Sequence, residues 1–494
     1  MSSFSRRGRS AAAALLLTLS LAEPNVLSAQ IGGIGAGTSL TPTSGWVNPA
    51  RLPNANGYLV MPGLGGLSIS AFHTGPRHGA VVSDEGLINI DGLLDGLDPL
   101  EHVVTDVVVP ILGFGFRAGP RWAFHYSSSA RVEQRTSYPR DLLTLAWRGN
   151  AHPDLIGTRI SLDGLGIYAQ AYVDHALSAS VELPKHNVRI GMGAHYLMGL
   201  GAVNTLTSRV GWETDPLDYA WTFDGALDVR AAGIPVDLNT LDSIGLDAFS
   251  SPAPMETPIA SGASIDLGLI WNPAPEWQIE AAATGLGSIR WDNLATAVRL
   301  DPQSFRFDGI DLLEALSAEN DSAGTGSSAT EEMLDSLANS WTPDWSGDAT
   351  FTSSPMRRLY VSARYAPVER FAATVFLARK TAWDAHFYSA GIGAEYRFGN
   401  VLSLHVLGQS FDAEQWLLGG GFSLRAGPVR WSLSTSNALP LLAYYDHNTL
   451  NFSTSVNFEF GWRKQGDDSR KKNGSGSSSK RRRNGGTSNT GGNL

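Results

Sequence analysis

Residues 448–463, N-T-L-N-F-S-T-S-V-N-F-E-F-G-W-R, are the stretch that decides the fold. Every second residue from Leu450 to Trp462 is apolar or tolerates an apolar face, and the residues between them are small or polar. Because side chains alternate across a strand, this stretch has two chemically opposite faces. The same alternation returns many times, with no obvious helices to cover the apolar side. The pattern predicts an all-β fold, a transmembrane antiparallel β-barrel with lipid outside and a polar lumen.

Turn signals such as Gly119-Pro120, Gly399-Asn400 and Gly427-Pro428 separate the candidate strands. We expect about 14 strands, with 12 to 16 allowed, because bacterial single-chain barrels have even strand numbers. Further candidates precede residues 448–463. They are residues 66–71, 107–118, 121–132, 158–162, 166–183, 188–200, 203–212, 218–230, 260–271, 277–291, 295–300, 358–366, 371–379, 386–398, 401–410, 416–426 and 429–436.

The connections between these strands are of two kinds. Many are short turns, and four are long, at about residues 74–105, 133–156, 231–258 and 301–356. Short turns at one rim and long loops at the other are typical of barrels in the outer membrane of Gram-negative bacteria. The sequence therefore predicts that the protein is located in the cell outer membrane.

The first 29 residues read as a secretory signal peptide. Three arginines precede an apolar run at residues 11–22, and Leu27-Ser28-Ala29 is a suitable cleavage site. The alternative, a transmembrane anchor, is disfavoured because a spanning helix needs roughly 20 apolar residues. The chain contains no Cys, which excludes lipid anchoring after cleavage, disulfides and thiolate metal sites.

The expected domain organisation has one barrel and several accessory segments. The loop insertion at 301–356 contains two short helix-like pieces, residues 309–316 and 330–339, and is either a surface loop or a gating or partner-binding element. The expected parts are a signal peptide at 1–29, an N-terminal segment at 30–56 that is a candidate plug, the outer-membrane barrel at 57–462 with its insertion, and a disordered basic tail at 463–494.

Glycine recurs at alternate positions on the polar, inward face of several strands. One such pair precedes Glu395 and Arg397 on the same face. Two interpretations stay open: the glycines provide barrel curvature, or they make room for an inserted segment or ligand. The inserted segment would be residues 31–56. The pairs are Gly113/Gly115, Gly191/Gly193, Gly285/Gly287 and Gly391/Gly393.

Charge is distributed unevenly along the chain. The tail holds nine Lys/Arg against Asp467 and Asp468, a net charge of +7, whereas the whole chain carries −10. An acidic body argues against nucleic-acid binding. The run from Lys480 to Arg483 could bind anionic lipid headgroups or a cell-wall or periplasmic partner, or simply be solvated. The expected partners are thus membrane lipid, a small hydrophobic ligand and, through the tail, a cell-wall or periplasmic component.

The sequence contains no motif that is typical of an enzyme, a nucleotide-binding site or a metal site. No P-loop, H-E-x-x-H or G-x-S-x-G pattern is present. His73 and His78 lack a third metal ligand nearby, and Asp301, Asp308 and Asp311 lack calcium-loop spacing. We therefore predict no catalytic, cofactor-binding or metal-binding residues, and no cofactor, and we assign no ligand-binding residue. An Asp/Ser/His triad formed by spatial neighbours stays open.

The chain resembles an uncharacterised domain-of-unknown-function family of bacterial outer-membrane barrels, which is distantly similar to the fatty-acid-transporter-like barrels. Two features depart from the family pattern: Gly285 replaces a usual acidic residue, and the basic tail is not a family feature. The resemblance implies an outer-membrane barrel and no functional residues. Its motifs are, in order, Asn48-Pro49-Ala50, Met61-Pro62, residues 138–142 (Y-P-R-D-L), 147–150 (W-R-G-N), 263–271 (A-S-I-D-L-G-L-I-W), 285–291 (G-L-G-S-I-R-W), 307–311 (F-D-G-I-D) and 359–365 (L-Y-V-S-A-R-Y).

Three functions follow as hypotheses. The first is passive transport of a small, hydrophobic molecule through the lumen. The second is a scaffold that transports nothing and anchors surface or periplasmic partners through its long loops or basic tail. An enzyme built in a barrel ranks last for want of a motif, so the protein is predicted not to be an enzyme. The first hypothesis rests partly on analogy of fold, which is weak support for function.

Overall fold

The computed structural model describes residues 41–53, 55–75, 89–233, 258–307, 344–347, 349–411, 415–439 and 448–462. The expected signal peptide, the two helix-like pieces at 309–316 and 330–339, and the basic tail lie outside these residues. The side chains of Trp345, Gln415 and Trp462 are likewise not described.

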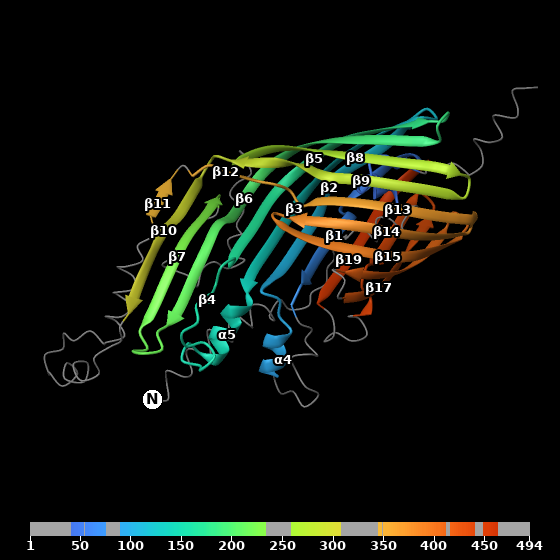
Figure 1. Ribbon diagram of the computed structural model, residues 1–494. Coiled ribbons are helices and arrows are strands. Elements are labelled where there is room, and N and C mark those ends of the chain that lie inside the picture. The colour runs from blue at the N-terminus through green and yellow to red at the C-terminus, as the bar shows by residue number, and fades with distance from the viewer. Residues whose placement is uncertain are drawn as a thin grey trace, which may run out of the picture.

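The described strands form a closed antiparallel barrel of 14 strands, as expected from the alternating pattern (Figure 1). The first strand pairs with the last, with Ala55 opposite Trp462, and this pairing closes the ring. The strands in ring order are β1 (Ala55–His73), β2 (Leu100–Ala118), β3 (Trp122–Pro139), β5 (Gly166–Leu183), β6 (Val188–Thr214), β8 (Ala260–Ala274), β9 (Trp277–Trp291), β13 (Arg357–Val368), β14 (Phe371–Ala382), β15 (Ala385–Phe398), β16 (Leu402–Phe411), β17 (Gln415–Ala426), β18 (Val429–Thr435) and β19 (Thr449–Trp462).

The two ends of the barrel differ in their connections. Tight turns join β2 to β3, β5 to β6, β8 to β9, β13 to β14, β15 to β16 and β17 to β18, all at the end where β1 begins and β19 finishes. We call this the turn end and the opposite end the loop end. The loop end carries the long connections, with two exceptions: Trp383 and Asp384 alone join β14 to β15, and three residues join β16 to β17.

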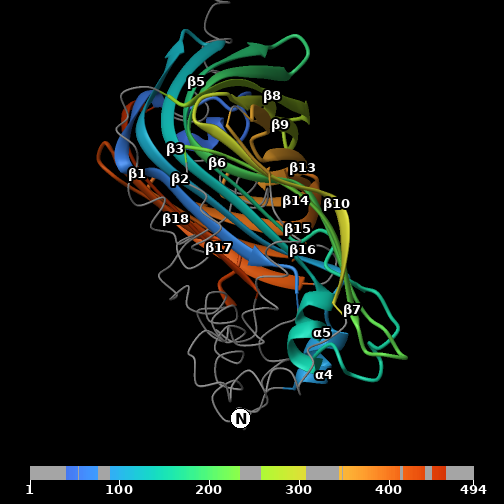
Figure 2. The ribbon, with the colours of Figure 1, turned by 90° about the vertical axis from the view of Figure 1, so that its left-hand side faces the viewer.

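Several strands lie outside the ring. The second half of β6 pairs with β7 (Trp221–Ala232), which pairs with β10 (Ala295–Phe307) and then with β11 (Asp344–Gly347). These strands extend the wall beyond the ring on one side of the loop end (Figures 1 and 2). Two shorter strands complete the sheet, β4 (Ile160–Ser161) against β6 and β12 (Phe351–Ser353) against β9.

The loop end differs from the sequence prediction in three respects. The candidate strands 188–200 and 203–212 are one strand, β6, and the loop expected at 301–356 contains strand residues at 301–307, 344–347 and 351–353. The loop expected at 133–156 contains the end of β3 and the helix α5 (Arg140–Arg148), and a second helix, α4 (Ile90–Asp95), lies beside it. Strand residues beyond the membrane face no lipid, so they lack the two-faced pattern by which strands were recognised.

The described helices are short. None of the helices in the described ranges is long and apolar enough to cross a membrane. The 3-10 helix η1 (Pro42–Trp46) is the only helical element on the N-terminal side of β1 within those ranges, and four of its five residues are buried. It therefore lies inside the barrel rather than on its surface.

The two faces of the strands are those expected. On β15, Ile392 and Phe398 are exposed at 61% and 53%, whereas Glu395 and Arg397 are buried. On β19, Asn451, Asn457 and Glu459 are buried, which matches the polar face of the stretch that decided the fold. The apolar residues thus face lipid and the polar residues face the lumen.

Candidate functional site

Residues 41–53 occupy the lumen near the turn end. A Cβ atom built at Gly191 would lie 2.2 Å from the carbonyl carbon of Pro49, and one built at Gly268 would lie 2.1 Å from Asn48 Oδ1. The glycines on β6 and β8 therefore allow this segment to approach the wall closely. At Gly191 the structure favours the inserted-segment interpretation over simple curvature.

The other glycine pairs have different roles. A Cβ atom at Gly391 would meet the Phe376 ring at 2.6 Å, so this glycine makes room for a neighbouring side chain. A Cβ atom at Gly287 would lie 2.0 Å from the Ala263 carbonyl oxygen on the next strand, which is a close approach of two wall strands. The inserted-segment interpretation thus holds at Gly191 and not at Gly391 or Gly287, and curvature stays a prediction.

Glu280 on β9 anchors the N-terminal segment. Its Oε2 atom accepts hydrogen bonds from Arg51 Nε at 2.9 Å, Asn48 Nδ2 at 3.3 Å and the Tyr360 hydroxyl at 3.1 Å. Asn48 Oδ1 also accepts from the Ala50 backbone N–H at 2.9 Å, which shapes the turn. Burial disfavours the charge on Arg51, but the Glu280 carboxylate more than offsets this, so the pKa of Arg51 is raised. The segment is held by a buried ion pair.

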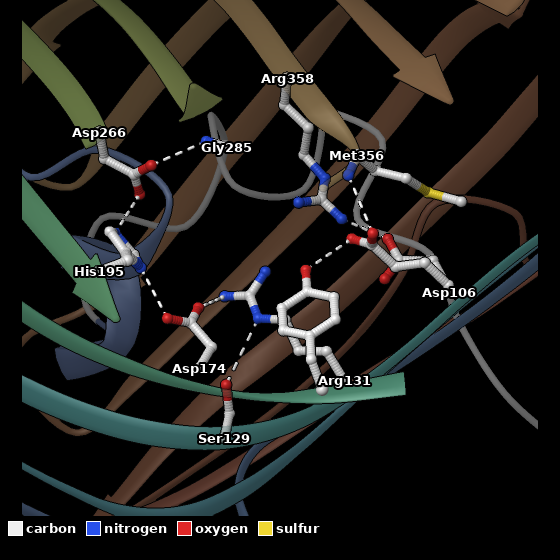
Figure 3. Close-up of polar contacts among 11 residues, drawn as sticks. Asp106, Ser129, Arg131, Asp174, His195, Asp266, Gly285, Met356 and Arg358 are labelled. Carbon is white, nitrogen blue, oxygen red and sulfur yellow. Dashed lines mark hydrogen bonds and ion pairs between the residues drawn. The ribbon is translucent and has the colours of Figure 1, made fainter. Parts of the chain in front are cut away.

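Beyond this anchor, eight ionisable residues on seven strands line the lumen, and we call them the charged wall. Asp106 on β2 accepts from Lys380 Nζ on β14 at 3.1 Å. It also accepts from Arg358, and Arg131 Nη2 lies 3.0 Å from Asp174 Oδ2 on the neighbouring strand (Figure 3). Buried charges are costly unless paired, and the contacts of Asp106 pair them across the lumen between distant strands. The charged wall consists of Asp106, Arg131, Glu133, Asp174, His195, Asp266, Arg358 and Lys380.

His195 lies between two carboxylates of the charged wall. Its Nδ1 atom is 2.8 Å from Asp174 Oδ1, and its Nε2 atom is 3.1 Å from Asp266 Oδ2 (Figure 3). Both ring nitrogens therefore face carboxylates, and within the described ranges neither is left to activate a hydroxyl. The Asp/Ser/His triad that the sequence left open does not form at this histidine.

The wall between β9 and β13 is irregular at the level of the charged wall. Residues 354–356 leave the ladder, and Met356 N–H donates to Glu133 Oε2 at 2.9 Å. Asp266 Oδ1 accepts from the N–H of Gly285, whose φ of +73° favours glycine, at 2.8 Å. A side chain at position 285 would meet the Met356 carbonyl oxygen at 2.7 Å. We call residues 354–356 the inward bulge.

A cavity of about 110 Å³ lies between the N-terminal segment and the inward bulge. Trp46 and Val47 border it from one side, Met356 from another, and the charged wall contributes Asp106, Arg131 and others. By comparison, an apolar cavity of roughly 150 Å³ holds benzene. The cavity thus has room for one small molecule or a few waters.

A cluster of apolar side chains lies in the lumen near the loop end. Phe72, Phe387 and Phe411 pack edge-on or stacked with ring centroids 4.8–6.4 Å apart. Lys380 Nζ lies 5.7 Å from the centre of the Phe72 ring, so this layer directly adjoins the charged wall. The apolar layer comprises Phe72, Val104, Met356, Ala382, Phe387, Phe411 and Leu417.

A different inner surface runs along β17, β18 and β19. Neutral side chains predominate on it and bond to one another: Ser432 donates to Ser423 at 3.0 Å, and Asn457 donates to Ser455 at 2.5 Å. Near the turn end it also carries the buried ion pair of Arg430 and Glu459. Thr43 Oγ1 of the N-terminal segment lies 3.3 Å from Ser455 Oγ. We call this surface the serine–asparagine ladder. It comprises Ser423, Ser432, Ser434, Ser436, Asn451, Ser453, Ser455 and Asn457, all buried.

Of the histidines and aspartates weighed as metal ligands, the structure describes only His73 and Asp301. His73 is stacked on Tyr138 and hydrogen-bonded to its hydroxyl, and Asp301 lies on β10. His78, Asp308 and Asp311 lie outside the described residues. In the ranges that the structure covers, no group of three or more His, Asp or Glu side chains is arranged to hold a metal ion.

Sequence reasoning singled out none of the charged-wall residues. A signal was present: charged residues at inward positions of otherwise apolar strands, such as Asp106 within 103–116 and Asp266 within 263–271. That signal identifies lumenal residues strand by strand. It does not show that Asp106 meets Lys380, which lies 274 residues later in the chain.

Comparison with known protein families shows to which family the chain belongs. A family model described as "Family of unknown function (DUF5723)" matches residues 49–436. The chain belongs to this family. The match confirms the resemblance to a domain-of-unknown-function family, and it spans the anchor, the charged wall and the inward bulge. No curated protein matches the chain.

Several solved barrels are similar to the chain. The Ralstonia pickettii toluene transporter TbuX is 12% identical, with 86% of this chain and 95% of that chain covered and a TM-score of 0.40. The Pseudomonas putida toluene transporter TodX is 8% identical, with coverages of 87% and 96% and a TM-score of 0.37. A Pseudomonas aeruginosa FadL homologue is 12% identical, with coverages of 88% and 99% and a TM-score of 0.35. At these levels their activities do not pass to this chain.

Proposed function

We propose that the protein is a passive transport barrel of the outer membrane for a small, hydrophobic molecule. The observation that carries the proposal is the cavity inside the closed barrel, between the N-terminal segment and the inward bulge. A scaffold needs only a filled barrel, whereas a cavity inside the barrel, bordered by two inserted elements, has the form of an occluded passage.

The orientation follows from the connections. Outer-membrane barrels place short turns in the periplasm and long loops outside, so the turn end is periplasmic. A molecule entering from outside then meets the apolar layer first, next the charged wall and the cavity, and last the N-terminal segment. The apolar layer favours a hydrophobic molecule at entry, and the N-terminal segment is the barrier to the periplasm.

The experiment that tests the proposal is conductance and solute flux of the refolded protein in lipid bilayers. A variant lacking residues 31–53 removes the barrier and stops before β1, which begins at Ala55. We expect larger conductance steps and faster uptake of a small apolar probe into vesicles in this variant than in the full chain. Retained barrel structure is checked by heat-shifted migration on gels.

The opposite result would end the proposal. A folded variant without residues 31–53 that passes neither ions nor the apolar probe shows that the lumen is not a passage. The scaffold hypothesis would then lead, and one observation already favours it. Trp212, Trp221, Phe223 and Phe307 form an aromatic group on strands beyond the ring, with centroids 4.5–6.4 Å apart.

The scaffold alternative has its own test. Replacing Trp221 and Phe223 by serine alters the extension and leaves the lumen untouched. A scaffold loses its surface partner in co-purification after this change, whereas a transporter keeps its flux.

A further inference from the structure

The interruption of the ladder between β9 and β13 has an unusual property. On its loop-end side, Ser353 lies opposite Ile289, and on its turn-end side, Arg358 lies opposite Thr284. Four residues separate the paired positions on each strand, residues 354–357 on one and 285–288 on the other. The unpaired sections of the two strands therefore have the same number of residues. Ser353 and Arg358 both face the lumen although they are five positions apart, so the section also contains a bulge at which the alternation of faces is reversed.

The inward position of this section is held from across the lumen. Met356 N–H donates to Glu133 on β3, and the Ser354 carbonyl oxygen accepts from Gln170 Nε2 on β5 at 3.0 Å. Ser353 Oγ donates to Gln170 Oε1 at 2.5 Å. Glu133 is also held by the Tyr172 hydroxyl at 3.1 Å and Gln170 Nε2 at 2.7 Å. These contacts narrow the lumen where the apolar layer meets the cavity.

We propose that residues 354–357 are a second gate, which opens when they pair with residues 285–288 of β9. The proposal rests on the proposed transport function and adds an outer barrier to the inner one. When the gate opens, Met356 N–H gives up its hydrogen bond to the Glu133 carboxylate and donates to a backbone carbonyl oxygen of β9 instead. This backbone donor therefore keeps a partner in both forms. Because the two sections have the same number of residues, no other strand has to slide, and a bulge stays within the paired section to keep both flanks facing the lumen.

Two features keep the closed form stable. Pro355 has no N–H, so the fully paired ladder would lack one bond at that position. Met356 is 1% exposed and packs in the apolar layer, and opening withdraws it from that contact. The closed and open forms thus contain similar numbers of backbone hydrogen bonds. This similarity is what allows one segment to have two stable arrangements.

The inner and outer barriers meet on the same strand. Tyr360 donates to Glu280, the anchor of the N-terminal segment, and it lies on β13 directly beyond Arg358 of the charged wall. A movement of residues 354–357 is therefore transmitted along β13 toward the segment that closes the turn end.

The chain has no Cys, so introduced thiols are the only ones present. Ser288→Cys with Ser354→Cys places two thiols opposite each other only in the paired form, and their disulfide traps the gate open. Gln170→Cys with Ser354→Cys, joined by a short bifunctional methanethiosulfonate reagent whose links are reducible disulfides, ties the inward bulge to the far wall and traps it closed. Arg290→Cys with Thr352→Cys is the matched control, because these residues already face each other in the ladder.

Flux of a small apolar probe into vesicles is measured before and after reduction, in the full chain and without residues 31–53. The open trap should raise flux roughly tenfold or more, because a state populated at ten per cent or less becomes the only state. The closed trap should lower flux by a similar factor. Reduction reverses both effects, and the control pair changes nothing.

Each other outcome counts against the gate. If both cross-links form without changing flux, while removal of residues 31–53 still raises it, the gate is overturned and the transport function stands. If the Ser288→Cys, Ser354→Cys pair never oxidises in the folded protein, the two sections do not pair and the gate is likewise overturned. If no folded variant passes the probe, both proposals fail.

Discussion

The charged wall and the serine–asparagine ladder are both polar inner surfaces of the same barrel, yet they are built on opposite principles. The charged wall includes bonds between distant strands, as from Asp106 to Lys380, beside pairs on neighbouring strands such as Arg131 and Asp174. The ladder bonds largely within neighbouring strands, as Ser432 does to Ser423. Buried charges require partners of opposite charge, and hydroxyl groups are satisfied by near neighbours. The two elements that close the lumen, the N-terminal segment and the inward bulge, are therefore held by strands that carry buried charged residues.

The largest effect is expected at the anchor of the N-terminal segment. Glu280→Ala leaves Arg51 buried without its main partner, which should lower the free energy of unfolding by about 3–5 kcal/mol. Urea unfolding in lipid, followed by heat-shifted migration, measures this. The control is Glu276→Gln in the exposed turn between β8 and β9, which should be neutral. Equal stability of the Ala variant and the unaltered protein would show that the ion pair does not anchor the segment.

The next effect tests pairing within the charged wall. Lys380→Met removes one of the two cations that bond to Asp106, and the loss should be about 1.5–3 kcal/mol, the range for hydrogen bonds to charged groups. Equilibrium unfolding measures it, with exposed Lys185→Met at the β5–β6 turn as the matched control. A stabilised Lys380→Met protein would show that the desolvation cost outweighs the pairing.

A smaller effect tests the glycines that admit the N-terminal segment. Gly191→Ala places a methyl group where Pro49 lies and should displace the segment at a cost of about 1–3 kcal/mol. Thiol labelling of Thr43→Cys should then become faster. Gly408→Ala is the control, since nothing lies within 4 Å of its added carbon. Unchanged labelling in the Gly191 variant would mean that the segment does not depend on this close approach.

The smallest effect is expected in the serine–asparagine ladder. Ser432→Ala removes one neutral hydrogen bond and should cost about 0.5–1.5 kcal/mol, with conductance unchanged. Unfolding and bilayer recordings of the same variant measure both quantities. A loss comparable to that of Glu280→Ala would abolish the distinction between the two surfaces.

Much of the architecture could be predicted from alternation. The lipid-facing position of Ile392, the inward position of Glu395 and the strand count follow because period-two patterns are local and survive in any barrel. Prediction was poorer at the loop end, where β6 continues as one strand and α5 follows β3. Those residues face no lipid, so tertiary pairing rather than a local pattern determines their structure.

The candidate site could be predicted only in part. Inward charged residues such as Asp174 were recognisable as lumenal, and the N-terminal segment was recognisable as a candidate plug. The contacts of Met356 with Glu133, and of Glu280 with Arg51, join residues more than 220 positions apart. Such contacts depend on the diameter and closure of the barrel, which no local pattern encodes.

By itself, the sequence determined that the chain spans a membrane as strands, which face of each strand meets lipid, and that the inner face is polar, because these properties follow from the chemistry of alternate residues. Only the tertiary structure decided which inward charges meet, where the N-terminal segment is held, and that the ladder between β9 and β13 is interrupted over the same number of residues on both strands. The physical reason is closure: bending the sheet into a ring brings distant strands across a narrow lumen, and their buried charges then pair where the geometry places them.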